Sequence, residues 1–232
     1  PNRMPFIGDQ AWFYLAARDA LLGNGLPLLG ITASITWLHQ GPLWTYLLVP
    51  LIAHPVLPAI LTSILGVVSV YLIYFLGGWP ASLLLAALPL AVLQSRMPYH
   101  TSLIPLLSIL LFLLLRRHRD FLSGLFLGFL YQLHLLTFIF WPIAIYKYLI
   151  SPPTAKTRVK DEKVGGDYRG GIFILGFLLG ILPFLLSGPT QTFGIFAWIA
   201  KHAATGFGGS TLSTAYLVVF LVPAILIASW FL

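Results

Sequence analysis

Long apolar runs separated by short polar or basic segments occupy the chain from residue 43 onward. Runs of this kind are typical of helices that cross a lipid bilayer. We therefore predict an all-α fold, a polytopic bundle of transmembrane helices. Several of the predicted spans are short for a hydrocarbon core of about 30 Å and require flanking residues or local thinning of the bilayer. The predicted spans are 56–76, 81–94, 101–115, 120–134, 135–150, 171–187 and 212–232.

The first 42 residues mix polar and apolar positions and contain no predicted span. Between residues 10 and 22, a helical spacing predicts a helix that lies at the membrane interface. The next apolar run, 43–53, would be only about 16 Å long as a helix, too short to cross. We interpret it as a re-entrant or interfacial helix that ends at His54-Pro55. The positions that share the helical spacing are Trp12, Leu15, Ala16 and Asp19.

Two clusters of positive charge set the predicted topology. Arg116–Arg119 and Lys156–Arg169 lie between apolar runs, and the positive-inside rule places such clusters in the cytoplasm. The segment 120–150 must then cross twice, which puts His134 at the opposite face. Counting 43–53 as a full span would move the first cluster outside, so the charge pattern favours the re-entrant interpretation. The segments that this count places on the outer face are 1–55, 95–100 and 187–211.

The chain is predicted to form a single membrane domain in four parts. Residues 1–55 form an outer loop with interfacial and re-entrant helices, and 56–150 form the transmembrane core. Residues 151–170 form a basic, disordered cytoplasmic loop, and 171–232 contain further spans. No internal repeat is detectable, which weakens a transporter interpretation. Because the chain opens on Pro1 without a methionine or a leader, we expect a preceding span. We also expect a further C-terminal portion that contributes to specificity.

Composition agrees with a membrane protein. Hydrophobic residues make up 59% of the 232 residues and mean hydropathy is +0.93, well above the 45–50% apolar share of a soluble domain. The formal net charge of +7 lies in short clusters between apolar runs, so it indicates membrane topology rather than nucleic-acid binding. With no cysteine, disulfides and thiolate metal sites are excluded.

One acid stands apart from the others. Most of the six acids lie in or beside basic clusters, whereas Asp9 follows Phe6-Ile7-Gly8. A carboxylate near lipid is costly unless a partner, metal or substrate compensates it. One acid among several cations suits a negatively charged ligand, such as a phosphate, beside a group that needs a base. The polar residues predicted at the outer face are Asp9, Gln10, Arg18, Asp19, His39, Gln40, Arg96, Tyr99, His100, Gln132, His134, Lys201 and His202.

A series of short motifs resembles one enzyme family. In the first outer loop these are Gly8-Asp9-Gln10, Ala17-Arg18, Gly25-Leu26-Pro27-Leu28-Leu29-Gly30 and His39-Gln40-Gly41-Pro42-Leu43-Trp44-Thr45-Tyr46-Leu47. Two more are Gln94-Ser95-Arg96 and Gly128-Phe129-Leu130-Tyr131-Gln132-Leu133-His134. In order and spacing, over about residues 6–145, they resemble GT-C membrane glycosyltransferases of the glycosyltransferase 39 group, which includes protein O-mannosyltransferases and aminoarabinose transferases.

The resemblance implies transfer of a sugar from a polyprenyl-phosphate carrier to a glycan, lipid or protein acceptor, with inversion at the anomeric carbon. Asp9 occupies the position of the family's key first-loop acid, proposed there as a base or metal contact. A carboxylate base contributes about 10²–10⁴-fold to such a reaction. The departing lipid phosphate needs cations rather than a proton donor, and Arg is best suited to bind it. The predicted substrate-binding residues are Arg96, as the leading phosphate contact, with His39, His100, His134, Gln10 and Lys201.

The chain departs from the family at Gln10, because many members carry a second acid there. A two-carboxylate metal site is therefore disfavoured, and no metal ligand or other cofactor is assigned. A divalent metal at His39, His100 and His134 stays open, although these residues lack the close paired spacing of a zinc-binding helix.

The candidates also have structural interpretations. Asp9 could cap a helix that starts near Gln10. Arg96 could extend to the lipid headgroups, and His134 could be a hydrogen-bonded buried residue. The remaining structural roles are an exposed helix face for Arg18 and Asp19, a turn for His39, and interface anchoring for Lys201 and His202.

We therefore predict a hexosyl or pentosyl transferase of mannosyltransferase-like type in the cell membrane, with Asp9 as the base at the outer face. The alternative is a carrier or flippase for a lipid-linked anion, which would use the same cations as a binding pocket. A third possibility is a non-catalytic scaffold in a membrane complex.

Overall fold

A computed structural model describes residues 8–33, 37–150, 168–192 and 194. In this part the chain is helical, and its one pairing of extended backbone is an isolated antiparallel bridge between Thr32 and His39. The predicted all-α class is thus confirmed for the described residues. The predicted span 212–232, Lys201 and His202, and the basic loop up to residue 167 lie outside them.

The first two helices form a separate small core. α1 (Gly8–Asp19) continues into a π-helical turn (Ala20–Asn24), and α2 (Leu43–Leu48) into a 3-10 turn (Val49–Leu51). α1 is already helical at Gly8, so Asp9 lies inside its first turn rather than at an N-cap before Gln10. The residues that pack these helices on the rest of the chain are Phe13, Ala17, Trp44, Leu48, Leu103 and Leu133.

α3 (Leu57–Ala87) is one helix by its hydrogen bonds but turns sharply at Gly78, whose φ of 68° is left-handed. The chain then comes back through α4 (Pro89–Arg96), which begins after an extended Leu88 because a residue before proline disfavours the helical region. The hydroxyl of Ser63 donates to the carbonyl of Ser95 at 3.2 Å, which places the end of α4 beside the start of α3. The predicted spans 56–76 and 81–94 are therefore an antiparallel pair, the second divided at Leu88.

The next two helices are also antiparallel. A 3-10 turn (His100–Leu103) leads into α5 (Ile104–Arg116), and α6 (Asp120–Leu133) returns after a tight turn in which His118 has a φ of 51°. Nη1 of Arg116 donates to the carbonyl of Phe75 at 3.2 Å, so the end of α5 lies beside α3 close to Gly78.

The predicted span 135–150 is irregular. A 3-10 helix (Leu135–Phe140), α7 (Trp141–Ile145) and a π-helix (Tyr146–Ile150) follow one another. α9 (Arg169–Gly180) and α10 (Leu182–Ser187) occupy the predicted span 171–187, with a break at Ile181. The main apolar core of the bundle lies between α5, α6, α7 and α9 and contains Leu111, Leu115, Leu127, Leu130, Ile143, Tyr148 and Phe173.

Glycines bring α6 and α9 together. Gly124 and Gly128 face Gly176 and Gly180, and a Cβ on Gly128 would lie 2.7 Å from the Cα of Gly180. Small residues spaced by four let helix backbones approach closely, a frequent arrangement in membranes. These two helices form the most extensive helix pair in the described part.

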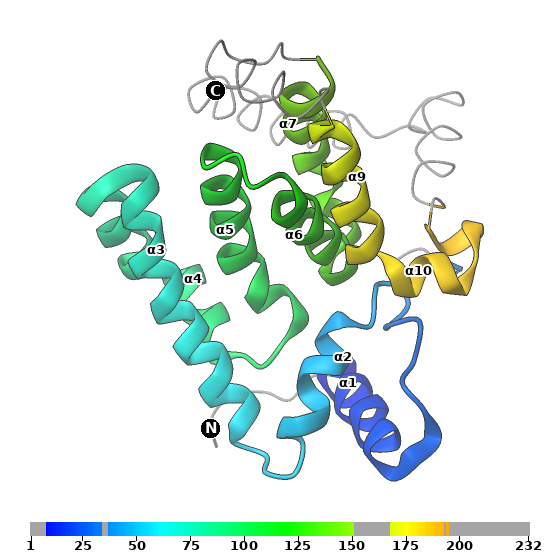
Figure 1. The fold of residues 1–232 in the computed structure, drawn as a ribbon. Helices are drawn as coiled ribbons and strands as arrows, with labels where there is room; N and C mark the ends of the chain where they lie inside the picture. The colour runs from blue at the N-terminus through cyan, green and yellow to red at the C-terminus, as the bar shows by residue number, and fades with distance from the viewer. Residues whose placement is uncertain (1–7, 34–36, 151–167, 193, 195–232) are drawn as a thin grey trace, which may run out of the picture.

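The successive segments thus run alternately in opposite directions and give the bundle two ends (Figure 1). We name them by the residues they carry. The Asp9 end holds Asp9, Arg96, Tyr99, His100 and His134; the Arg116 end holds Gly78, Arg116, His118, Asp120 and Arg169.

α3 is long and apolar enough to span a membrane, and only 11% of its most apolar window is buried in the protein. α4 and the segment His100–Arg116 would pass the same criterion together, with a bend of 118° between them. α6 and α9 are apolar but shorter. By length and composition, the described residues therefore contain one candidate span, or two if the bent pair counts as one.

Candidate functional site

The carboxylate of Asp9 accepts a hydrogen bond from a tyrosine that is distant in the sequence. The hydroxyl of Tyr99, in the turn after α4, donates a hydrogen bond of 2.7 Å to Oδ2 of Asp9. Burial raises the pKa of Tyr99, and so do its hydrogen bond to Asp9 and the charge of that residue, so the phenol stays a donor. The side chain of Asp9 is exposed, and among the described residues no donor reaches Oδ1. The carboxylate is thus oriented at one oxygen and accessible at the other.

Two histidines lie next to this pair. The ring of His100 is 4.1 Å from that of Tyr99 and 5.1 Å from that of Phe13, centroid to centroid. His134, which ends α6, stacks parallel to His100 at 6.1 Å. Segments around residues 9–13, 99–100 and 134 therefore meet at one place, as required if they form one site.

His100 is a neutral residue in this setting. It is only 2% exposed, and burial, followed by the proximity of His134, lowers its pKa. Neither ring nitrogen has a hydrogen-bond partner among the described protein atoms. Such a ring offers one donor and one acceptor to a ligand, but not a positive charge.

Further buried polar atoms, with no protein partner in the part of the chain that the structure describes, lie around the start of α2. The amide of Gly41 donates to the carbonyl of Gln132 at 2.7 Å, which joins the segment before α2 to the end of α6. Buried polar groups normally have hydrogen-bond partners, from protein or from solvent. These atoms are therefore available to water or a ligand. They are Oε1 of Gln40, Nε1 of Trp44, Oγ1 of Thr45 and Oε1 of Gln132.

Arg96, the predicted phosphate contact, is the last residue of α4 and is exposed. It precedes Tyr99 by three residues and so lies at the same end of the bundle as Asp9. A cavity of about 290 Å³ lies nearby between α3, α4 and α5, and Ser95 and Ser102 line it. Neither Asp9 nor Arg96 lines this cavity.

The other predicted residues are placed differently. Gln10 is 3% exposed, so its side chain faces the interior beside Phe13 rather than the surface that Asp9 faces. His39 is bridged to Thr32, and its backbone amide donates to Oε1 of Gln191 at 3.1 Å, which ties it to the segment after α10. Lys201 lies outside the described residues.

No group of three or more histidine, aspartate or glutamate side chains is placed to hold a metal ion within the described residues. His39, His100 and His134 do not form such a group. We therefore assign no metal ligand.

Tyr99 is not among the predicted catalytic and substrate-binding residues. The sequence predicts it only as a polar residue of the outer face, because a tyrosine in a short loop carries no chemical signature of its own. Its neighbour His100 is among the predicted substrate-binding residues and is the one sequence signal close to Tyr99. The contact with Asp9, 90 positions away, appears only in three dimensions.

No protein-family model, curated protein or solved structure matches the chain. The resemblance to GT-C glycosyltransferases therefore rests on the sequence motifs. Within the described residues, the geometry combines an oriented, accessible carboxylate with neutral buried polar groups and an exposed arginine. Such a set can accept a proton from a hydroxyl, bind polar uncharged groups and attract an anion.

Proposed function

We propose that this protein is a multi-pass membrane glycosyltransferase of GT-C type that moves a sugar from a polyprenyl-phosphate donor to an acceptor hydroxyl at the outer membrane face. The observation that carries the proposal is the hydrogen bond from Tyr99 to Asp9. It leaves one carboxylate oxygen of Asp9 oriented and accessible, which is what a general base needs.

The topology follows from charge at the two ends. The Arg116 end carries Arg116, Arg117, Arg119, Lys147 and Arg169, which suits the cytoplasm under the positive-inside rule. The Asp9 end would then face outward, as predicted from the sequence. The alternating direction of the segments is consistent with several crossings, although most of the helices are individually short.

In the proposed reaction, Oδ1 of Asp9 takes the proton of the acceptor hydroxyl as its oxygen attacks the anomeric carbon. The bond between that carbon and the phosphate oxygen breaks, and the lipid phosphate leaves with the electron pair. Attack and departure occur on opposite faces of the sugar, so the configuration inverts. Tyr99 keeps the carboxylate in position during this step.

The neutral polar groups at His100 and around the start of α2 suit a sugar. His100 has two ring nitrogens, and Gln40 and Thr45 have side-chain oxygens, that lack a protein partner within the described residues. Sugar hydroxyls both donate and accept hydrogen bonds, so they match a surface of neutral donors and acceptors.

The departing phosphate needs positive charge. Arg96 is proposed to bind it, because a guanidinium donates two parallel hydrogen bonds to phosphate oxygens. The position of Arg96 at the exposed end of α4 lets an attached lipid chain remain in the bilayer.

The test measures release of polyprenyl phosphate, a product common to every sugar and acceptor. The complete protein in native membranes is supplied with polyprenyl-phosphate mannose, glucose or aminoarabinose. Asp9→Asn should lose at least about a hundredfold in rate while still binding polyprenyl phosphate. Asp19→Asn is the matched control, because Asp19 is an exposed acid at the other end of α1.

Normal release by Asp9→Asn would show that Asp9 is not the base. Movement of the lipid between leaflets without release, unaffected by Asp9→Asn, would instead indicate a carrier. Neither binding nor release by the wild type would indicate a scaffold.

A further inference from the structure

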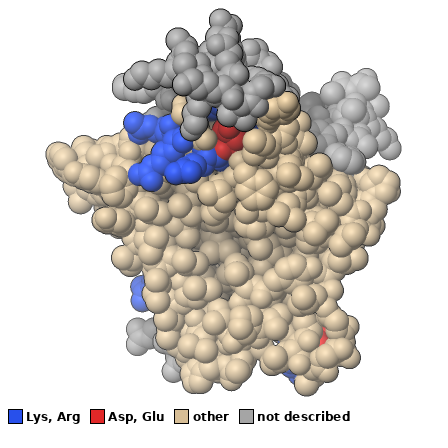
Figure 2. Space-filling model, in the orientation of Figure 1, with Lys and Arg blue, Asp and Glu red and all other residues tan. Residues whose placement is uncertain are grey.

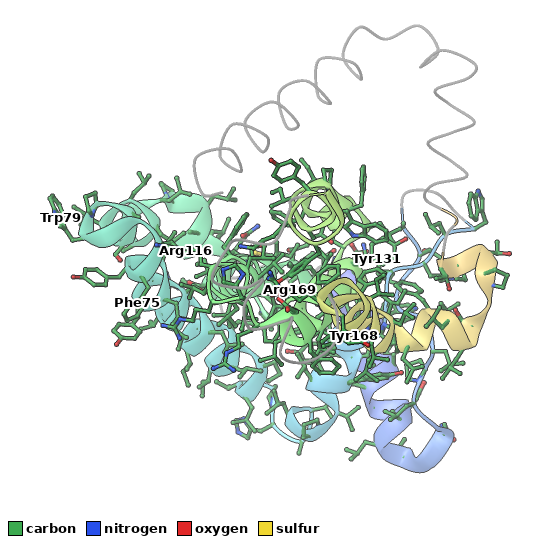
Figure 3. All side chains as sticks on the ribbon, turned by 45° about the horizontal axis from the view of Figure 1, so that its top comes forward. Phe75, Trp79, Arg116, Tyr131, Tyr168 and Arg169 are labelled. Carbon is green, nitrogen blue, oxygen red and sulfur yellow. The ribbon has the colours of Figure 1, made fainter. Side chains whose placement is uncertain are left out.

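Basic side chains converge at the Arg116 end, away from Asp9. They come from three elements: the turn between α5 and α6, the π-helix Tyr146–Ile150, and the first turn of α9. Figure 2 shows these lysine and arginine side chains as one patch with an acidic side chain among them. Figure 3 shows that Arg116 and Arg169 lie on the same side of the bundle.

Arg169 is fixed at the centre of this patch. Its Nε donates to Oδ2 of Asp120 at 3.1 Å and its Nη2 to Oδ1 at 3.3 Å. Nη2 also lies 2.8 Å from Nδ1 of His118, and the guanidinium carbon is 5.8 Å from the centre of the Tyr148 ring. The guanidinium is thus ordered before any ligand arrives, which lowers the entropic cost of binding.

This end carries more basic than acidic side chains. Among its described residues the acid is Asp120, and the bases are Arg116, Arg117, Arg119, Lys147 and Arg169. Arg169 and Asp120 are only 15% and 13% exposed, so their charges are weakly screened. Burial lowers the pKa of His118, and so do the charges of Lys147 and Arg169, whereas the charge of Asp120 raises it. An anion would relieve this excess.

The patch would bind through side chains. The amides of Arg117, His118 and Arg119 already donate to the carbonyls of Leu113, Leu115 and Leu114, so they are not available to a ligand. The side chains of Arg117 and Arg119 are exposed, and in sequence they flank His118, which contacts the guanidinium of Arg169. Planar guanidinium groups bind phosphate oxygens in pairs.

We propose that Arg117, Arg119, Lys147 and Arg169 form a binding site for a phosphoryl group, carried by an anionic phospholipid of the cytoplasmic leaflet or by free phosphate. In the proposed topology this end lies at the cytoplasmic headgroups, where anionic lipids attract basic residues. The site does not depend on the sugar-transfer chemistry proposed for Asp9.

The pKa of His118 reports whether an anion occupies the site. An anion in the site favours the protonated imidazole and therefore raises the pKa of His118. The complete protein, with isotope-labelled histidine, is placed in nanodiscs of phosphatidylcholine alone or mixed with phosphatidylglycerol, and His118 is titrated by NMR. Phosphatidylglycerol should raise its pKa, whereas inorganic phosphate added to phosphatidylcholine nanodiscs should do so only if the source is soluble.

Single substitutions test whether phosphatidylglycerol binds at this patch. Arg117→Gln and Lys147→Gln should each weaken phosphatidylglycerol binding about fivefold, the effect expected for one cation near an anionic surface. Arg18→Gln is the matched control, because Arg18 is an exposed cation at the end of α1. Asp9→Asn should leave the titration of His118 unchanged, which separates this site from the proposed catalytic one.

The proposal is overturned if neither phosphatidylglycerol nor inorganic phosphate moves the pKa of His118. It is also overturned if Arg18→Gln weakens binding as much as Lys147→Gln, since the attraction would then be unspecific. Arg117 is exposed and should not be needed for folding, so its variant keeps the test valid even if Lys147→Gln unfolds.

Discussion

The hydroxyl of Tyr99 and the carboxylate of Asp9 are joined by a hydrogen bond of 2.7 Å, although 90 positions separate them in sequence. One residue belongs to the turn between α4 and α5 and the other to the first turn of α1. Because the contact links two separate parts of the chain, it also fixes α1 against the bundle.

Removing this hydrogen bond should slow sugar transfer. A hydrogen bond to a charged group is worth about 1.5–3 kcal/mol, so Tyr99→Phe should reduce the rate about tenfold or more. The measurement is polyprenyl-phosphate release at saturating donor, which reports positioning rather than donor affinity.

A double-mutant cycle separates positioning from loss of fold. If Tyr99 acts through Asp9, adding Tyr99→Phe to Asp9→Asn should have almost no further effect on rate. Equal losses in both backgrounds would show that Tyr99 acts independently of Asp9.

The glycine contact between α6 and α9 should tolerate no side chain. A Cβ on Gly128 would lie 2.7 Å from the Cα of Gly180 and 2.8 Å from the carbonyl oxygen of Phe177. Overpacking of this kind costs about 1–3 kcal/mol, so Gly128→Ala should lower the thermal midpoint in detergent.

Gly171 provides the control on the same helix pair. A Cβ there meets nothing within 4 Å, and the residue lies inside α9. Gly171→Ala should therefore be neutral or stabilise the helix by about 0.5–1 kcal/mol. Equal destabilisation by both changes would mean that the close approach of α6 and α9 is not what stabilises the bundle.

Stability should depend on pH through His100. Burial, and then His134, lower the pKa of His100 from its ordinary value of 6.5, so the folded protein favours the neutral ring. The groups that face this ring are His134 and Tyr99, with Asp9 bonded to the latter. Below about pH 6.5 the unfolded chain binds more protons than the folded one, so the free energy of unfolding decreases as pH falls.

The matching measurement is the thermal midpoint as a function of pH. His100→Gln should remove a large part of the loss below pH 6.5, because glutamine does not titrate. A wild-type curve that is flat from pH 7 downward would contradict the neutral, buried assignment of His100.

The ion pair between Arg169 and Asp120 should contribute to stability because both side chains are largely buried. Arg169→Ala leaves the Asp120 carboxylate buried without its partner, which costs about 3–5 kcal/mol for a buried pair. Denaturant unfolding in detergent measures this cost. Arg117 is exposed and forms no ion pair within the described part, so Arg117→Gln should stay within about 0.5 kcal/mol of wild type.

The alternation of apolar runs predicted most of the helices, because hydrophobic segments interrupted by polar turns leave few other folds. The same pattern predicts the short helical segment at 43–53. It also predicts that His100 and His134 lie together at the end opposite Arg116. The break at Leu88 was missed, although Pro89 carries the signal, because hydropathy alone does not register the conformational effect of proline.

Side-chain partners were less predictable than helices. Gln132, expected at the outer face, instead donates to the carbonyl of Gly180 in the interior. That contact requires α6 and α9 to approach each other closely at Gly128 and Gly180. Long-range hydrogen bonds of this kind depend on which helices become neighbours, and polarity along one segment does not determine that.

The reversal at Gly78 also bears on how deeply the protein would sit in a bilayer. Residues 57–77 rise about 31 Å as a helix, close to the thickness of a hydrocarbon core of about 30 Å. Trp79 follows at once, 69% exposed and directed away from the bundle in Figure 3, and Arg116 is bonded to Phe75 one turn earlier. Trp and Arg both favour the headgroup region. In a bilayer, Gly78 would therefore end the apolar rise of α3 at the level where the indole of Trp79 and the guanidinium of Arg116 could anchor the bundle to the headgroups.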